Sequence, residues 1–67
     1  MKTIDVGTVI YKRRDDLCID QRTLSAIAGV AVHTLSNIEA GKGNPTIETL
    51  DRILDALGLE LRIQVKA

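Results

Sequence analysis

Three glycines divide this chain into short segments. Gly29, Gly41 and Gly58 each directly follow a run in which apolar residues recur at the spacing of an α-helix. A glycine in that place can adopt the left-handed backbone conformation that ends a helix. The chain is therefore predicted to fold as several short helices packed against one another.

The apolar spacing predicts four helices, covering residues 5–17, 21–28, 31 or 32–40, and 46–57. Asp20 can cap the second helix by accepting hydrogen bonds from its first free amides. The second helix is expected to turn Leu24, Ile27 and Ala28 inward, and the third Leu35 and Ile38. The other apolar residues at helical spacing are Val6, Val9, Ile10, Leu17, Ile47, Leu50, Ile53, Leu54 and Leu57.

The last segment changes its period, because apolar and polar residues alternate strictly from Leu59 to Lys66. This alternation predicts a half-buried strand. A single strand has no partner within an otherwise helical chain, but a second copy can provide one by antiparallel pairing. A frayed end, or packing of the tail on its own helices, is the alternative. The expected dimerisation face consists of Leu59, Leu61, Ile63 and Val65.

The fold class expected is thus all-α: a compact four-helix domain at residues 1–58, followed by a dimerisation tail at 59–67 that pairs as a short strand across a dimer. With 67 residues, of which 45% are hydrophobic, the chain can form only a small core. Oligomerisation is a common way to stabilise such a small domain.

Composition excludes several other ways of stabilising the core. One cysteine, Cys18, cannot form an intramolecular disulfide, and a single histidine, His33, leaves no ligand set for structural zinc. No metal or cofactor is expected. No apolar run is long enough to span a bilayer and no signal peptide is visible, so a cytoplasmic location without membrane contact is expected.

The charge balance limits how the chain could hold a nucleic acid. Nine basic and nine acidic residues give zero formal net charge, which argues against binding by bulk electrostatics alone. The only basic run is Lys12 to Arg14. Because Tyr11 is the only aromatic residue, the stacking platforms that hold single-stranded nucleic acid are not expected.

Two short helices joined by a tight glycine turn have the length and punctuation of a DNA-reading helix-turn-helix. The sequences QRTLSAIAGV at 21–30, TLSNIEAGK at 34–42 and NPTIETL at 44–50 resemble the Xre family of phage-repressor and Cro-like domains. The resemblance extends from about Val6 to Leu59. It implies that the third helix lies in the major groove of double-stranded DNA and that the start of the second helix faces a phosphate.

The resemblance also implies roles for particular residues. Gln21 is expected at the DNA backbone, and Thr34, Lys42 and Asn44 occupy places where the family touches phosphates. The outward face of the third helix would read bases through Val32, His33, Ser36 and Asn37. Two positions depart from the family pattern: Ala31 replaces a serine-like cap, and Ala40 replaces a polar residue that often meets a phosphate.

One further pair follows from the resemblance. Arg14 and Glu39 match residues that form an internal ion pair in similar repressors, linking the first helix to the end of the third. Arg14 also lies on the apolar stripe of its helix, so it should be partly buried and needs a partner. The pair is interpreted as structural, not catalytic.

The function expected is a sequence-specific DNA-binding transcriptional regulator, acting as a homodimeric repressor on a two-fold symmetric operator. The ending at residues 54–63 resembles the antitoxin branch of the family, in which a C-terminal strand pairs across the dimer and a toxin protein is a second partner. The alternative is a protein-interaction module that has lost DNA binding, which zero net charge, Ala31 and Ala40 favour. An enzyme is not expected, because the chain offers neither a pocket nor a catalytic triad.

Overall fold

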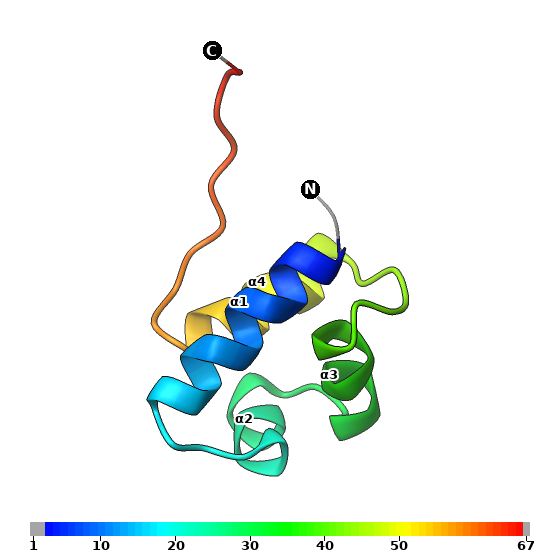
Figure 1. The fold of residues 1–67 in the computed structure, drawn as a ribbon, viewed down its shortest axis with the longest axis vertical. Helices are drawn as coiled ribbons and strands as arrows, with labels where there is room; N and C mark the ends of the chain where they lie inside the picture. Colours follow the sequence, from blue (N-terminus) through cyan, green and yellow to red (C-terminus); the bar gives the residue numbers. More distant parts are fainter. Residues whose placement is uncertain (1–2, 67) are drawn as a thin grey trace.

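The computed structural model describes residues 3–66, which contain four helices and no β-strand. The helices are α1 (Thr3–Asp16), α2 (Gln21–Ala28), α3 (Val32–Glu39) and α4 (Ile47–Ala56). Figure 1 shows them gathered into one bundle, from which the C-terminal segment departs. The expected all-α domain of four helices is confirmed, with boundaries within about two residues of the predicted ones. None of these helices is long and apolar enough to cross a membrane.

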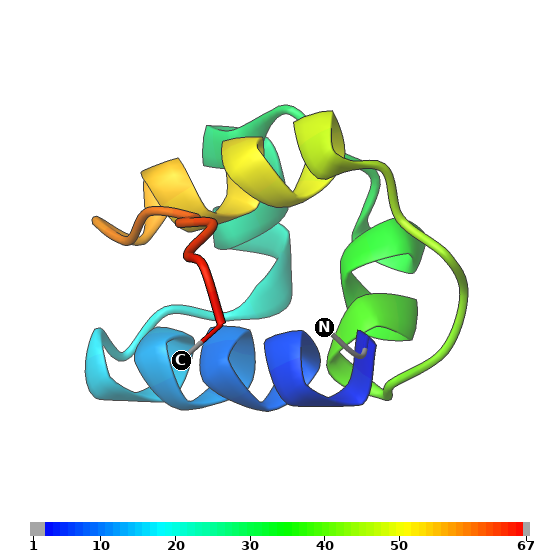
Figure 2. The ribbon, with the colours of Figure 1, turned by 90° about the horizontal axis from the view of Figure 1, so that it is seen from above.

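The four helices share one core. α1 packs against α3, α4 packs against α2, and α2 packs against α3, so that α2 and α3 connect the two longer helices (Figure 2). The side chains that lose essentially all contact with solvent come from every helix and from the residue that ends α4: Ile10, Leu24, Leu35, Ile38, Ile53 and Leu57.

The prediction that Ile27 faces inward is wrong. Ile27 is 62% exposed, and Ser25 is buried in its place beside Leu24 and Ala28. The reason is tertiary, because α2 contacts both α3 and α4 and its buried face is therefore displaced toward Ser25. Three other residues at helical spacing also remain outside the core, namely Val9, Leu17 and Ile47, which are 51%, 41% and 64% exposed.

Local hydrogen bonds set the helix ends. Asp20 caps α2, since its carboxylate accepts from the backbone N–H of Thr23 at 2.7 Å. Gly29 ends α2 in the left-handed conformation, with φ of 71°. The end of α1 has the same geometry without a glycine: Cys18 has φ of 56°, and the N–H of Ile19 closes the turn on the carbonyl of Arg14 at 3.2 Å. Cys18 is therefore held in a conformation that glycine adopts more readily.

Gly7 brings α1 and α3 close together. A Cβ atom at this position would collide with the carbonyl oxygen of Ile38 and would lie 3.1 Å from the Cα of Glu39. The absence of a side chain at Gly7 thus fixes how near α1 can approach the last turn of α3. A glycine inside a helical pattern is the sequence signal that could have indicated such an approach.

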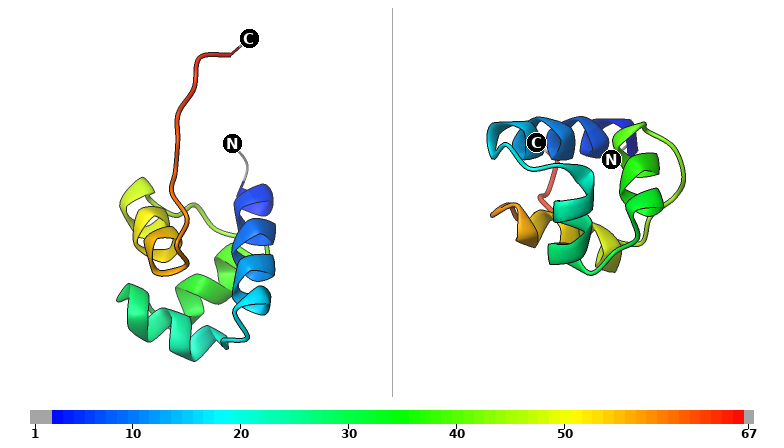
Figure 3. Two further views of the ribbon diagram at one scale, coloured as in Figure 1. Left: turned by 90° about the vertical axis from the view of Figure 1, so that its left-hand side faces the viewer. Right: turned by 90° about the horizontal axis from the view of Figure 1, so that it is seen from below.

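The C-terminal tail leaves the bundle in an extended conformation (Figure 3). Leu59 and Leu61 are half-buried against the core, whereas Ile63 and Val65 are 90% and 98% exposed. Residues 59–66 form no strand, because a strand requires a neighbour for its backbone hydrogen bonds and the single chain supplies none there. Ala67, the last residue of the predicted tail, lies outside the described residues. Pairing of the tail across a dimer stays a prediction.

Candidate nucleic-acid interface

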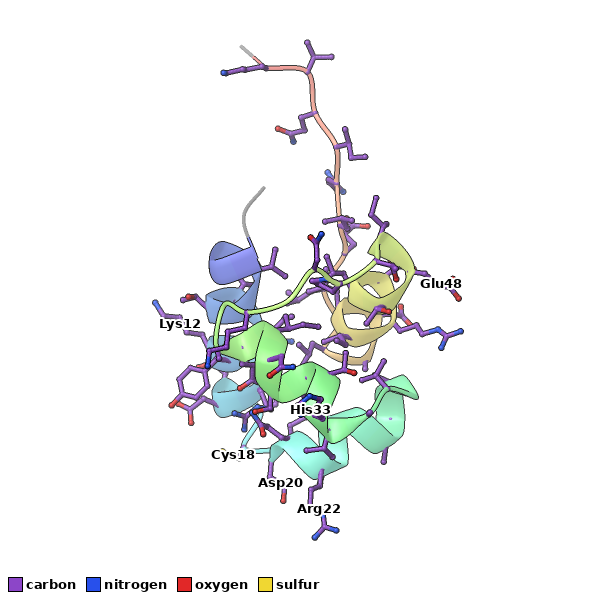
Figure 4. All side chains as sticks on the ribbon, turned by 90° about the vertical axis from the view of Figure 1, so that its right-hand side faces the viewer. Lys12, Cys18, Asp20, Arg22, His33 and Glu48 are labelled. Atoms are coloured by element: carbon purple, nitrogen blue, oxygen red, sulfur yellow. The ribbon has the colours of Figure 1, made fainter. Side chains whose placement is uncertain are left out.

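The α2–α3 unit presents one outer surface. Leu35 and Ile38 anchor α3, since both are buried beneath it. Figure 4 shows α3 toward the viewer with His33 on it, while Asp20 and Arg22 project at the beginning of α2. Because the buried inner face holds α3 in the bundle, its outer face is available as the candidate surface for the major groove of DNA.

The residues predicted to read bases lie on that outer face to different degrees. Val32 and His33 are exposed, whereas Thr34, Ser36 and Asn37 are half-buried. Side chains four residues apart lie one above the other on a helix, which groups Val32 with Ser36 and His33 with Asn37. The outer face therefore consists of two parallel rows.

His33 and Asn37 are hydrogen-bonded to each other. The amide nitrogen Nδ2 of Asn37 lies 3.2 Å from the ring nitrogen Nε2 of His33. In the tautomer whose ring hydrogen is on Nδ1, Nε2 accepts from this amide nitrogen. The second amide hydrogen and the oxygen of Asn37 form the donor and acceptor pair that matches the major-groove edge of adenine.

Gln21 is fixed at the start of α2. Its Nε2 donates to Oε1 of Glu39 at 3.2 Å, which ties the first residue of α2 to the last residue of α3. The family resemblance places Gln21 at the DNA backbone. Because Glu39 takes one of the two amide hydrogens, the second hydrogen and the carbonyl oxygen are what Gln21 can offer to DNA.

Glu39 is the centre of a small polar network. Arg14 donates to both of its carboxylate oxygens, from Nε at 2.9 Å and from Nη2 at 2.8 Å, and the two side chains are only 14% and 7% exposed. Arg14 also donates from Nη1 to the carbonyl of Ile19 at 2.9 Å, and its guanidinium lies 5.4 Å from the centre of the Tyr11 ring. The hydrogen bonds to Glu39 raise the pKa of Arg14. The contacts with Ile19 and Tyr11 were not foreseen from the sequence.

A hollow of about 210 Å³ lies between α3 and the loop that follows it. The structure brings four predicted contact residues together around this hollow: Thr34, Asn37, Lys42 and Asn44. Ile38, Gly43 and Pro45 complete its lining. Amide, hydroxyl and ammonium groups are the donors that phosphate oxygens accept from. Gln21, Val32, His33 and Ser36 do not line the hollow, so the predicted residues do not form one continuous cluster.

The basic run of α1 is mostly used inside the protein. Nε of Arg13 donates to the carbonyl of Leu57 at 2.9 Å and so caps the end of α4, while Arg14 is bound to Glu39. Of these three residues only Lys12 is exposed. The run therefore adds less to a DNA-attracting surface than its composition indicates.

The sequence pattern of the helix-turn-helix family matches residues 10–64, and the chain belongs to this family, in its Xre- and Cro-like form. The matched region is a helix-turn-helix DNA-binding domain.

A relative supports the same class. The chain is 40% identical over 50 residues to an HTH-type transcriptional regulator of Haemophilus influenzae that is itself described as uncharacterized. The match covers 75% of this chain and 51% of the relative, so the chain spans about half the length of that protein.

Proposed function

We propose that the protein is a dimeric, sequence-specific repressor that reads operator DNA with the outer face of α3. The observation that carries this proposal is the arrangement of α3 itself: Leu35 and Ile38 are buried beneath it, and the hydrogen-bonded pair of His33 and Asn37 lies on the opposite side. Such an arrangement lets a helix lie in a major groove without any change in its own packing.

Binding is proposed to use two kinds of contact, one to phosphates and one to bases. Gln21, Thr34, Lys42 and Asn44 are proposed to hold phosphates, which fixes the position and direction of α3. Base recognition is assigned to Val32, His33, Ser36 and Asn37. Among these, Asn37 suits adenine and Val32 suits a thymine methyl group. Together they give affinity from the backbone and selectivity from the groove.

A dimer would double the reading surface. Two copies joined through their tails would place two α3 helices in successive major grooves, about 34 to 36 Å apart, and so cover a two-fold symmetric operator and block transcription. The exposure of Ile63 and Val65 supports this assignment, because two large apolar side chains in a row are otherwise left in water.

The narrower proposal is that this repressor is the antitoxin of a toxin–antitoxin pair. Its support is the resemblance of residues 54–63 to the antitoxin branch. The test is to express the neighbouring gene alone and together with this chain. Growth arrest by the neighbour that co-expression relieves would support the antitoxin role, and a harmless neighbour would remove it.

The decisive experiment on the repressor is fluorescence anisotropy with the DNA upstream of the gene, against scrambled competitor. We expect selective binding that Asn37→Ala weakens about fivefold or more, because a bidentate base contact contributes about 1 to 3 kcal/mol of discrimination. Asp51→Asn, an exposed position on α4, is the matched control and should bind as the unmodified protein does. If selection from random DNA also yields no preferred site, the protein is an interaction module and the repressor proposal fails.

A further inference from the structure

The tail already has the geometry of a strand. Nη2 of Arg62 lies 2.7 Å from Oε1 of Glu60, and side chains two residues apart face the same way only when the backbone is extended. The apolar side chains of residues 59, 61, 63 and 65 therefore lie on the opposite face from this ion pair. A row of that kind is ready to pair with a second strand.

We propose that two tails pair antiparallel about a two-fold axis that passes through Ile63, so that the tail is its own complement in shape and charge. This inference rests on the proposed dimer and specifies its register. In this register residues 60–66 of both copies pair, and each residue faces the partner residue at the same distance on the other side of Ile63.

The pleat of the strand restricts where the axis can lie. Residues that face each other directly in an antiparallel pair point to the same side of the sheet. An axis between two neighbouring residues would thus set every apolar side chain against a polar one. The axis must pass through a residue, which leaves Leu61, Arg62, Ile63 and Gln64 as the central candidates.

Charge removes two of these candidates. With Arg62 on the axis, the two guanidinium groups would face each other. With Gln64 on the axis, Arg62 would face the partner's Lys66. With Ile63 on the axis, Glu60 of each copy faces the partner's Lys66, so that two such pairs form. Arg62 then faces the partner's Gln64, which carries no charge. Opposite charges across a strand pair stabilise it, and like charges destabilise it.

The bundle removes the remaining candidate. An axis through Leu61 would require Val65 to pair with the partner's Leu57. Leu57 is only 1% exposed, and its carbonyl accepts from Nε of Arg13, so it belongs to the end of α4 and is not available to a strand. Pairing would stop at residue 63 and leave Val65 in water.

The proposed register also explains the gradient of burial along the tail. Val65, 98% exposed in one chain, comes to lie opposite the partner's Leu61, which is half-buried against its own core. Each exposed end is thereby covered at the base of the other tail, while the two Ile63 side chains meet at the axis. In this register the apolar residues at 61, 63 and 65 each face an apolar residue of the other tail.

Disulfide trapping tests the register. In a Cys18→Ser background, single cysteines are placed at 61, 62, 63 and 64, and the chains are equilibrated in glutathione redox buffer. Ile63→Cys is expected to form covalent dimers and the other three are not. In the proposed register the two copies of residue 62, and likewise of residue 64, lie diagonally across the strand pair at about 7 to 8 Å, beyond the reach of a disulfide, and the two copies of residue 61 lie farther apart still. Mixing Leu61→Cys chains with Val65→Cys chains is expected to form a mixed disulfide.

Every other outcome overturns the register. Trapping at 61, 62 or 64 instead moves the axis. If no position is trapped while sedimentation still shows a dimer, the two copies join elsewhere. The tail register is then wrong, but the proposed dimeric repressor stands. A monomer in sedimentation removes the dimer itself, and DNA-binding measurements then report separately on whether the chain is a repressor.

A charge exchange provides an independent test. Glu60→Lys is expected to weaken the dimer roughly ten- to thirtyfold by sedimentation equilibrium, because it replaces two attractive pairs with two repulsive ones. Adding Lys66→Glu to that variant should restore association, whereas adding Arg62→Glu should not. If Arg62→Glu restores association of the Glu60→Lys variant and Lys66→Glu does not, the axis passes through Leu61 and the proposal is refuted.

Discussion

The guanidinium of Arg14 is held by both carboxylate oxygens of Glu39, across 25 residues of sequence and with both side chains largely withdrawn from water. Because Gln21 also donates to Glu39, the same carboxylate joins α1, α2 and α3. The position of α3 relative to α1 and α2 thus depends on one acidic side chain.

Removing Glu39 should therefore destabilise the protein strongly. We expect Glu39→Ala to lower the free energy of unfolding by about 3 kcal/mol, since it leaves the guanidinium of Arg14 buried without its partner. Urea denaturation measures the change. The matched control is Arg52→Ala, which breaks the exposed pair with Glu48 and should cost less than about 1 kcal/mol. Equal effects at both sites would mean that burial of the Arg14 pair contributes nothing.

The contact at Gly7 reverses the usual effect of a helix-forming substitution. Alanine inside a helix is ordinarily more favourable than glycine by about 1 kcal/mol. At this site the added Cβ would meet the backbone of Ile38, so Gly7→Ala is expected to destabilise the fold by about 1 to 3 kcal/mol. Asp51→Ala on the exposed side of α4 serves as the control for an alanine that meets nothing. A stabilised Gly7→Ala variant would show that α1 and α3 are not in this close contact.

The helices could be predicted because their signals are local. Asp20 and Gly29 act on the backbone beside them, so the sequence shows where α2 begins and ends. The direction in which a helix buries its side chains is a tertiary property, and this is why Ile27 was misplaced. The alternating period of the tail predicts a strand. A single copy forms none, because it offers the tail no neighbouring strand.

The candidate site was predictable to a different extent. The residues around the hollow and the Arg14–Glu39 pair came from the family resemblance, because nothing in composition or spacing connects Arg14 with a residue 25 positions away. The contact between Arg13 and the end of α4 has no local signal at all. His33 and Asn37 are an exception, since a spacing of four residues on a helix is enough to bring them together.

Acid should weaken the cap of α2 in a defined direction. The backbone N–H of Thr23 holds the pKa of Asp20 below its usual value, so the unfolded chain binds this proton more readily than the folded one. The stabilisation is then complete above the ordinary pKa of an aspartate, about 4, and is lost as the pH falls through the lower folded value. We compare the urea midpoint of the unmodified protein with that of Asp20→Asn, whose cap is neutral. The difference between the two midpoints should be constant near neutral pH and should change in acid, where the unmodified protein loses the stabilisation by its ionised cap. A difference independent of pH would contradict the cap.

Cys18 offers a route to a more stable domain. Its φ of 56° is costly for a residue with a Cβ, and glycine relieves that cost while losing more freedom on folding. We expect Cys18→Gly to raise the free energy of unfolding by about 0.5 to 1 kcal/mol, which corresponds to about 2 to 8 °C in Tm for a domain of this size. Cys18→Ala keeps the strain and should not stabilise. A gain with alanine equal to the gain with glycine would assign the effect to the thiol instead of the backbone.

Salt dependence can separate the two kinds of DNA contact proposed for α3 and its loop. Lys42 is exposed beside the hollow, and as a phosphate contact it would release about one counterion on binding, so Lys42→Ala should reduce the slope of log K against log salt by about 1 and weaken all sequences alike. Asn37→Ala should leave that slope unchanged and relax the preference at one base pair, because an amide that contacts a base edge displaces no counterion. Anisotropy titrations over a salt series, with operator and scrambled duplexes, measure both effects. If Asn37→Ala instead changes the slope while Lys42→Ala changes selectivity, the roles assigned to the two residues are reversed.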